Sequence, residues 1–424
     1  MADLNGLYRE GVVNLRDRML PFWSRLKDEE RGGFYSLVTD DLEVHKDADR
    51  GCILNSRILW FFSSAYRSLH EESALEDARH AFRYLKEVFW DHENGGLYWS
   101  VKADGTPLRT DKYCFCQAFG ICALAAYAEA EDLNDALSIR DSQETEASME
   151  ALRLAYELFD LIESKMRDTE GYLEAFDREL NAIPNDVFSV KGVQASRTMN
   201  TALHLLEAYM ELYRADGATR VKKRLFAILD IFLDRIYLRS KTRLGVYFDL
   251  DYRPLLDLYS YGHDIECAWI IDRALSLLGD YPREKELRVV TENLTAAVYR
   301  QAYLEDGNFG SLPIEAEKGV DKDVRVWWVQ AEAVNGFLNG VQTAMENNDM
   351  KAVLRYAKAV GKVWAFISNE LIDPRPEGEW FSEIRAGGFP DHTKNIVDEW
   401  KCPYHNGRMF MEFIRRLNPE EDEK

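Results

Sequence analysis

Histidines beside carboxylates are the first candidates for acid–base chemistry in this sequence. His263 precedes Glu266 by three residues, a spacing that puts both side chains on one face of a helix. Two interpretations stay open: Asp264 or Glu266 caps a helix start, or Glu266 orients a catalytic imidazole. His405 lies in the segment Cys-Pro-Tyr-His-Asn-Gly-Arg (402–408), whose proline suits a first helical turn. Imidazole titrates near neutral pH, so a histidine in a pocket can serve as a general acid or base.

Further polar and aromatic side chains stand at the beginnings of otherwise apolar segments. Burying such groups is costly unless they are paired or face a cavity. We therefore predict that they converge on one polar pocket. His204 alone could equally be a core histidine, and Trp327 and Trp328 suit either a core or the apolar face of a sugar ring. The residues concerned, besides those above, are Asn55, Arg57, Gln117, Asn200, His204, Trp327, Trp328, Glu332, Trp400, Asn406 and Arg408.

The elements that must position these groups recur along the chain. A glycine turn followed by aromatic or apolar residues appears six times, at steps of 63, 75, 74, 62 and 71 residues. Such regular spacing indicates six structural repeats. The marker glycines are Gly33, Gly96, Gly171, Gly245, Gly307 and Gly378.

Each repeat contains two helices of different character. An amphipathic helix precedes the glycine, as in residues 74–90, 147–167 and 222–238, which is typical of an outer position. The second helix is apolar nearly all round, which is typical of the interior. These second helices are predicted at residues 51–69, 114–130, 198–215, 264–278, 327–345 and 403–417.

Six outer and six inner helices in alternation predict an all-α (α/α)6 barrel, with an open solenoid as the rival arrangement. No Pro/Gly/Ser-rich boundary divides the sequence, so residues 1–424 are predicted to form a single catalytic domain. The polar stretch 132–145 is predicted to be a longer loop between two halves of an outer helix. The beginnings of the inner helices then share one end of the barrel.

Composition excludes several classes of partner. The 53 Lys and Arg against 74 Asp and Glu give a net charge of −21, which disfavours nucleic acids and anionic membranes. The longest apolar stretch, 119–128, is too short to span a bilayer. The N-terminus lacks the basic and apolar regions of a secretory signal. The six cysteines form no CxxC pair and are predicted to be reduced and buried. These features favour a cytoplasmic protein.

Five segments together resemble a known family. Residues 50–60, 198–209, 261–266, 326–334 and 400–408 resemble the N-acylglucosamine 2-epimerase superfamily, and within it most closely the cellobiose 2-epimerase branch. The resemblance implies an (α/α)6 barrel that epimerises or isomerises sugars without a redox cofactor. We expect a small-molecule sugar as the partner, and a monomer or weak homodimer.

The resemblance also implies roles for individual residues. His263 and His405 would be the general acid/base pair, Arg57 would bind the reacting oxygens, and Glu266 would support His263. One departure is Phe115, where a tyrosine is usual in the family; Tyr113 is the nearby candidate to replace that hydroxyl. The residues that would line the sugar site are Asn200, His204, Trp328, Glu332, Trp380 and Trp400.

The implied reaction is inversion at C2 of the reducing-end sugar of a β-1,4-linked disaccharide, through an enediolate. A mannose 2-epimerase or a mannose/fructose-type aldose–ketose isomerase is the alternative, with N-acylglucosamine 2-epimerase less favoured. A glycoside hydrolase using Glu266 and Glu332, or a sugar-binding protein, is the alternative from outside the family. No metal is expected: His204, His263, Glu266 and His405 could bind zinc, but the sequence lacks a two-ligand helix motif.

Overall fold

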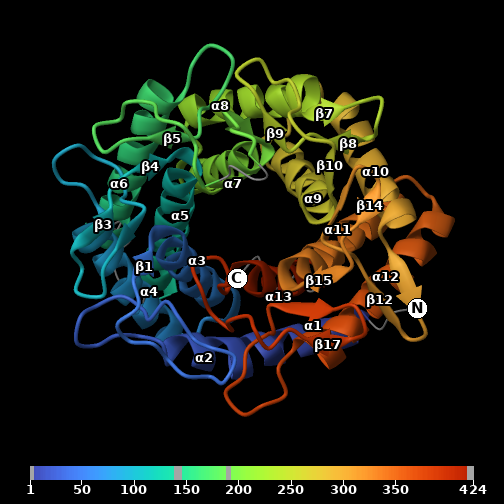
Figure 1. The fold of residues 1–424 in the computed structure, drawn as a ribbon, viewed down its shortest axis with the longest axis horizontal. Helices are drawn as coiled ribbons and strands as arrows, with labels where there is room; N and C mark the ends of the chain where they lie inside the picture. The colour runs from blue at the N-terminus through green and yellow to red at the C-terminus, as the bar shows by residue number, and fades with distance from the viewer. Residues whose placement is uncertain (1–3, 138–145, 188–191, 418–424) are drawn as a thin grey trace.

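Inner helices line the centre of the molecule in a ring (Figure 1). The computed structural model describes residues 4–137, 146–187 and 192–417. Each inner helix packs against the next one, and the last packs against the first, so the ring is closed. The inner helices are α3 (Cys52–Leu69), α5 (Cys114–Leu137), α7 (Met199–Asp216), α9 (Tyr261–Leu278), α11 (Trp327–Glu346) and α13 (Tyr404–Leu417).

A second layer of helices backs this ring (Figure 1). Because the inner helices are contacted on both sides, their apolar faces are buried all round, as their composition demands. Several outer helices end in one π-helical turn, at Leu85–Phe89, Ile162–Met166, Phe232–Ile236 and Ile367–Leu371. A further π-helical turn, Leu15–Met19, joins the two segments of the first outer helix. The outer helices are α1 (Leu4–Asn14) with α2 (Leu20–Ser24), α4 (Glu72–Tyr84), α6 (Glu146–Leu161), α8 (Thr219–Ile231), α10 (Glu284–Gln301) and α12 (Met350–Phe366).

Short antiparallel strands occupy the connections at the end where the inner helices begin. Most strands that lead into an inner helix pair with the following repeat, as β1 does with β2 and β6 with β9. The strands are β1 (Arg50–Gly51), β2 (Ser100–Val101), β3 (Pro107–Arg109), β4 (Lys112–Tyr113), β5 (Ala175–Phe176), β6 (Arg197–Thr198), β7 (Tyr237–Leu238), β8 (Arg243–Leu244), β9 (Tyr247–Phe248), β10 (Leu258–Ser260), β11 (Leu304–Asp306), β12 (Phe309–Ser311), β13 (Glu315–Glu317), β14 (Val320–Asp321), β15 (Val324–Val326), β16 (Glu383–Arg385) and β17 (Phe389–Pro390).

The marker glycines lie in tight hairpins that leave the outer helices. Lys27 pairs with Phe34 across the first such turn, and Trp90 pairs with Leu97 across the second. Gly33 and Gly96 have φ angles of 65° and 79°, a left-handed conformation that favours glycine. The sequence repeat therefore marks the turn that redirects the chain from the outer layer towards the inner one.

The prediction of a mostly helical protein is confirmed, with two differences in its elements. Helix α5 continues to Leu137, so the loop expected at 132–145 is wrong for its first six residues; residues 138–145 lie outside the described residues. That stretch also joins an inner helix to α6 and does not divide an outer helix. Helix α9 begins at Tyr261, three residues earlier than expected, which places His263 in its first turn. Among the described residues, no helix is long and apolar enough to cross a membrane.

Candidate active site

A cavity of about 370 Å³ opens where the inner helices begin. Its size falls within the roughly 300–1,000 Å³ range of small-molecule sites. Eight of the ten predicted site residues line it: Arg57, Asn200, His204, His263, Glu266, Trp328, Trp400 and His405. The remaining lining residues are Phe115, Phe119, Val326, Trp327, Ser382, Glu383, Lys394, Asp398 and Lys401.

His263 enters the cavity from the first turn of α9. Its Nδ1 lies 2.7 Å from Oγ of Ser260, the residue just before the helix. This contact fixes the ring through Nδ1 and leaves Nε2 available to a ligand. Burial, and the nearby His204, lower the pKa of His263 to about 3. The imidazole is therefore neutral at physiological pH, which is the form that accepts a proton.

His405 approaches from the first turn of α13. Its Nδ1 lies 2.8 Å from Oε1 of Glu332, a fully buried carboxylate on α11. When Nδ1–H donates to this carboxylate, Nε2 carries the lone pair. Burial, Arg408 and Arg57 hold the pKa of His405 well below its usual value. A second neutral imidazole is thereby available as a base.

Trp328 contacts both histidines. Its ring centroid lies 4.7 Å from that of His263 and 5.4 Å from that of His405. Gly262 makes room for this tryptophan, because a Cβ at that position would lie 2.6 Å from Trp328 Cζ3. The two imidazoles therefore flank one aromatic surface on a common cavity wall.

Arg57 supplies an uncompensated cation beside these histidines. Its guanidinium carbon lies 4.3 Å from the ring centroid of Phe119 and 4.6 Å from that of Tyr404. Within the part of the chain that the structure describes, no carboxylate forms an ion pair with Arg57. Its charge is thus held by aromatic faces and stays available to a developing anion in the cavity.

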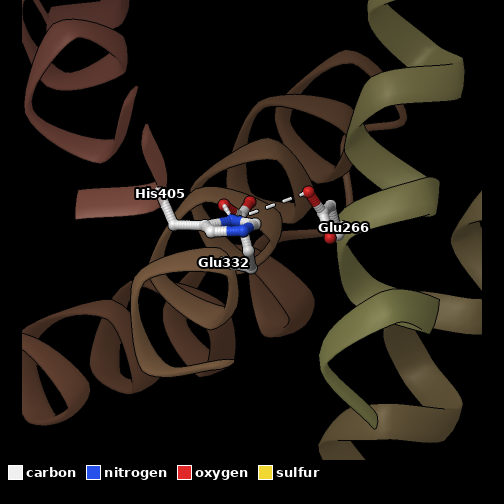
Figure 2. Close-up of side chains that lie close together, drawn as sticks. All are labelled: Glu266, Glu332 and His405. Atoms are coloured by element: carbon white, nitrogen blue, oxygen red, sulfur yellow. Dashed lines mark hydrogen bonds and ion pairs between the residues drawn. The ribbon is translucent and has the colours of Figure 1, made fainter. Parts of the chain in front are cut away.

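A buried charge cluster extends from the cavity wall, where Glu266 and His405 lie, to Glu332 behind it. Figure 2 shows Glu266, Glu332 and His405 pointing towards one another from α9, α11 and α13. Their candidate ligand atoms lie within 4.8 Å of one another, a geometry that could hold a metal ion. The guanidinium of Arg408 donates to both carboxylates, however, and supplies the positive charge that a metal ion would bring.

Glu266 does not occupy the position that the family resemblance implied. Its Oε1 lies 3.7 Å from Nδ1 of His405 and accepts a hydrogen bond from Arg408. Among the described residues, no hydrogen bond joins it to His263, whose Nδ1 contacts Ser260 instead. The expected Glu266–His263 support is therefore wrong, because the side chain of Glu266 turns towards α13. The capping interpretation of Asp264 is also wrong: its buried carboxylate accepts from Leu244 N.

Two predicted lining residues lie outside the cavity wall. Glu332 is buried behind His405, where it accepts hydrogen bonds from Trp269 Nε1 (2.9 Å) and Arg408. Trp380 is buried against α13, with its ring edge-on to Phe410 at a centroid distance of 6.0 Å. Both corrections follow from helix rotation and loop direction, which side-chain type alone does not specify.

The family departure at Phe115 bears on the cavity mouth. Phe115 lines the cavity, and its ring is nearly parallel to that of Trp400, 6.3 Å away. Tyr113 does not replace the missing hydroxyl, because its own hydroxyl donates to Asp186 and its side chain is buried. The wall at Phe115 is therefore apolar.

Several contributors were missed by sequence reasoning. Ser260 contacts His263, and Glu207 contacts His204 with its Oε2 at 3.4 Å from Nδ1 of that histidine. Both lie three residues from the histidine that they contact, a spacing that could have found them. Gln117, expected near the pocket, instead bonds the backbone of Leu97. The charged rim at 382–401 comes from a loop without helical periodicity and left no such signal.

The chain is similar to a described family and to known proteins. The family profile described as N-acylglucosamine 2-epimerase (GlcNAc 2-epimerase) matches residues 32–405. The chain is 41% identical over 417 residues to a cellobiose 2-epimerase from Eubacterium cellulosolvens, covering 95% of this chain and 96% of the relative. It is likewise 41% identical over 402 residues to a cellobiose 2-epimerase from Ruminococcus albus, covering 95% and 97%.

A solved structure extends the similarity to the fold. The cellobiose 2-epimerase from Bacillus thermoamylovorans B4167 superposes with a TM-score of 0.87 at 38% identity, covering 97% of this chain and 100% of that one. The chain belongs to the N-acylglucosamine 2-epimerase family. The family assignment made from the five sequence segments is confirmed.

Proposed function

We propose that this protein is a cellobiose 2-epimerase that acts without a cofactor. It inverts C2 of the reducing-end sugar of β-1,4-linked disaccharides, interconverting glucose and mannose at that position. The observation that carries the proposal is the placement of His263 and His405 against Trp328 on one cavity. Identity of about 40% to cellobiose 2-epimerases over nearly the whole chain supports the choice of substrate.

The reaction begins from the open-chain sugar, whose C2 proton is acidified by the neighbouring aldehyde. One imidazole removes this proton through Nε2, and the other, after taking up a proton from solvent, returns one to the opposite face of C2. Contacts through Nδ1, to Ser260 for His263 and to Glu332 for His405, keep both Nε2 atoms free. The roles reverse with the direction of the reaction.

Arg57 stabilises the intermediate. Removal of the C2 proton places negative charge on O1 as an enediolate, and a fixed guanidinium opposes that charge without reorganisation. Asn200 and His204 bind sugar hydroxyl groups from α7, and Trp400 stacks on a sugar ring at the exposed mouth. Glu266 and Glu332 act through His405 and Arg408.

The remaining proposals concern the whole protein. We infer an (α/α)6 barrel in which residues 1–424 form one catalytic domain, supported by the closed helix ring. Six free, buried cysteines and the net charge of −21 support a cytoplasmic location and argue against nucleic acid as a partner. A monomer or weak homodimer is expected.

The test is incubation with cellobiose in deuterated water, followed by separation and NMR of the products. We expect glucosyl-mannose with deuterium at C2. A product without deuterium at C2 would exclude the proton-transfer mechanism. A ketose product would identify an aldose–ketose isomerase, free glucose would identify a hydrolase, and binding without turnover would identify a sugar-binding protein; each outcome overturns the proposal.

A further inference from the structure

One buried guanidinium gathers three carboxylates behind the catalytic histidines. Arg408 Nη2 donates to Oε1 of Glu266 and, at 2.7 Å, to Oε1 of Glu332. Its Nη1 donates to Oε1 of Glu207 and, at 2.9 Å, to the hydroxyl of Tyr404. The carboxylates come from α9, α11 and α7, so Arg408 ties three inner helices to α13.

Arg408 does not reach the substrate cavity. Its guanidinium carbon lies over the rings of Trp269 and Tyr404, at 5.0 and 4.5 Å from their centroids. Its other side lines a second cavity of about 380 Å³, whose walls come from the later parts of the inner helices. Arg408 thus lines the second cavity and not the substrate cavity, and it acts on the reaction through His405 and the carboxylates that it holds.

The charge count shows what this guanidinium does. Three buried carboxylates face one another here. With Arg408 beside them, burial and the neighbouring carboxylates raise the pKa of Glu266 to about 8, and they also raise the pKa of Glu332. Arg408 lowers the pKa of both groups and so favours their charged form. Without it, mutual repulsion and burial would raise the pKa of Glu332 further and favour its protonated form.

Protonation of Glu332 would change the neighbouring histidine. The charged carboxylate accepts Nδ1–H of His405 at 2.8 Å and thereby leaves the lone pair on Nε2. A protonated Glu332 would instead donate to Nδ1, which moves the imidazole hydrogen to Nε2 and removes the base from the cavity. The tautomer of His405 therefore depends on the charge of Glu332.

We propose that Arg408 is a positioning residue for the epimerisation: by keeping Glu332 as a carboxylate, it fixes the His405 tautomer that presents its lone pair to the substrate. This inference rests on the proposed function for its kinetic consequence, whereas the tautomer itself is a property of the resting enzyme. Arg408 Nη2 itself lies 3.4 Å from Nδ1 of His405, farther than Oε1 of Glu332 at 2.8 Å, so the carboxylate is the nearer partner of that nitrogen. The other titratable or charged groups that surround the pair are Arg57, His204, Glu207, His263, Glu266 and Tyr404.

The kinetic test compares Arg408→Met with the wild type on cellobiose. We expect kcat at pH 7 to fall at least tenfold with KM changed less than about threefold, because Arg408 does not touch substrate. The acid limb of the kcat–pH profile should move to higher pH, since Glu332 then ionises only at higher pH, and raising the pH should recover part of kcat. A loss of kcat that is independent of pH would show a merely structural role and overturn the proposal.

Two further variants control the test. In Glu332→Gln the amide oxygen still accepts Nδ1–H but cannot titrate, so Arg408→Met on that background should produce no shift of the acid limb. A shift that persists in the double variant would contradict the proposal. If Arg408→Met does not fold, Arg408→Lys replaces it. Because lysine cannot span Glu332, Glu266 and Glu207 at once, we expect the acid limb of the kcat–pH profile to move in the same direction by a smaller amount. An unchanged kcat–pH profile overturns the proposal.

The tautomer is measured separately, by long-range ¹H–¹⁵N spectra of the ¹⁵N-histidine-labelled protein without substrate, assigned with His405→Asn. We expect the Nδ1–H tautomer in the wild type and a shift towards Nε2–H in the Arg408 variant. An unchanged tautomer overturns the proposal. A changed tautomer in a protein that does not epimerise cellobiose would instead overturn the proposed function and leave the role of Arg408 standing.

Discussion

At the scale of single residues, Arg57 has the clearest consequence for rate. Its charge is held between Phe119 and Tyr404 and faces the cavity. Removing one donor to a developing oxyanion typically costs about 2.7–4 kcal/mol. We therefore expect Arg57→Ala to lower kcat on cellobiose at least 100-fold, measured by product chromatography.

Two comparisons define the cause of that loss. Arg57→Lys keeps the charge but not the planar fork, so its kcat should fall between those of Arg57→Ala and the wild type. Arg253→Ala, which removes a solvent-exposed arginine far along the sequence, should leave kcat unchanged. An Arg57→Ala enzyme that retains more than a tenth of wild-type kcat would exclude Arg57 as the stabiliser of the enediolate.

Site residues were predictable where their type conflicted with their surroundings. His263, His405 and Arg57 are polar groups in apolar helices, and only a cavity or a partner makes their burial tolerable. Glu332 met the same criterion, yet it lies behind His405 and not on the wall. A polar side chain within an apolar helix therefore identifies the site. The direction in which that side chain points depends on the rotation of its helix within the assembled ring.

At the scale of elements, ion pairs with buried basic partners join the hairpins to the inner helices. Asp28 pairs with Arg50, Asp91 with Lys112 and Asp168 with Arg197, and each basic residue lies two positions before an inner helix. The helix positions were predictable from hydrophobic periodicity. The ion pairing was not predictable, because it joins turn residues to two-residue strands about 20 to 30 positions away, and neither has helical periodicity.

The ion pair of Asp91 and Lys112 in the second repeat makes the free energy of unfolding depend on pH. Burial would raise the pKa of Asp91, but hydrogen bonds from Arg178 and Lys112 outweigh burial and hold that pKa well below its ordinary 3.8. The ionised form stabilises the fold above about pH 4, and this contribution is lost as the pH falls towards the folded-state pKa. At pH 7, Asp91→Asn should cost about 3–5 kcal/mol, because it leaves the fully buried Lys112 without its carboxylate.

Denaturant unfolding from pH 7 to pH 3 checks this prediction. The difference in unfolding free energy between the wild type and Asp91→Asn should be full at neutral pH and should narrow below about pH 4. The exposed Asp160 provides the control, since Asp160→Asn should change stability by less than about 0.5 kcal/mol. A difference that stays constant with pH would exclude ionised Asp91 as the source.

At the scale of the whole molecule, the first and last repeats must meet to close the ring. Helix α13 packs against α3 and α1, and in the loops Val38 bridges Val397. Dividing 424 residues by about 150 residues per domain gives roughly three domains, whereas the six glycine turns predict one ring. What periodicity could not supply was the contact at this seam, because it joins residues that lie more than 300 positions apart.

Gly407 tests whether the seam controls both stability and activity. A Cβ at this position would lie 2.7 Å from Cδ2 and 2.9 Å from Cε2 of Phe61, a fully buried residue of α3. Overpacking of this kind typically costs about 1–3 kcal/mol, against about 1 kcal/mol gained when alanine replaces a helical glycine. We expect Gly407→Ala to lower Tm, and to lower kcat as well because displacement of α13 moves His405 and Arg408.

The exposed Leu354 on α12 supplies the matched control, since Leu354→Ala should change neither Tm nor kcat appreciably. The contrary result is that Gly407→Ala raises Tm through its higher helix propensity and leaves kcat unchanged. That result would show that the contact between α3 and α13 accommodates a methyl group, and that the position of α13 does not depend on ring closure.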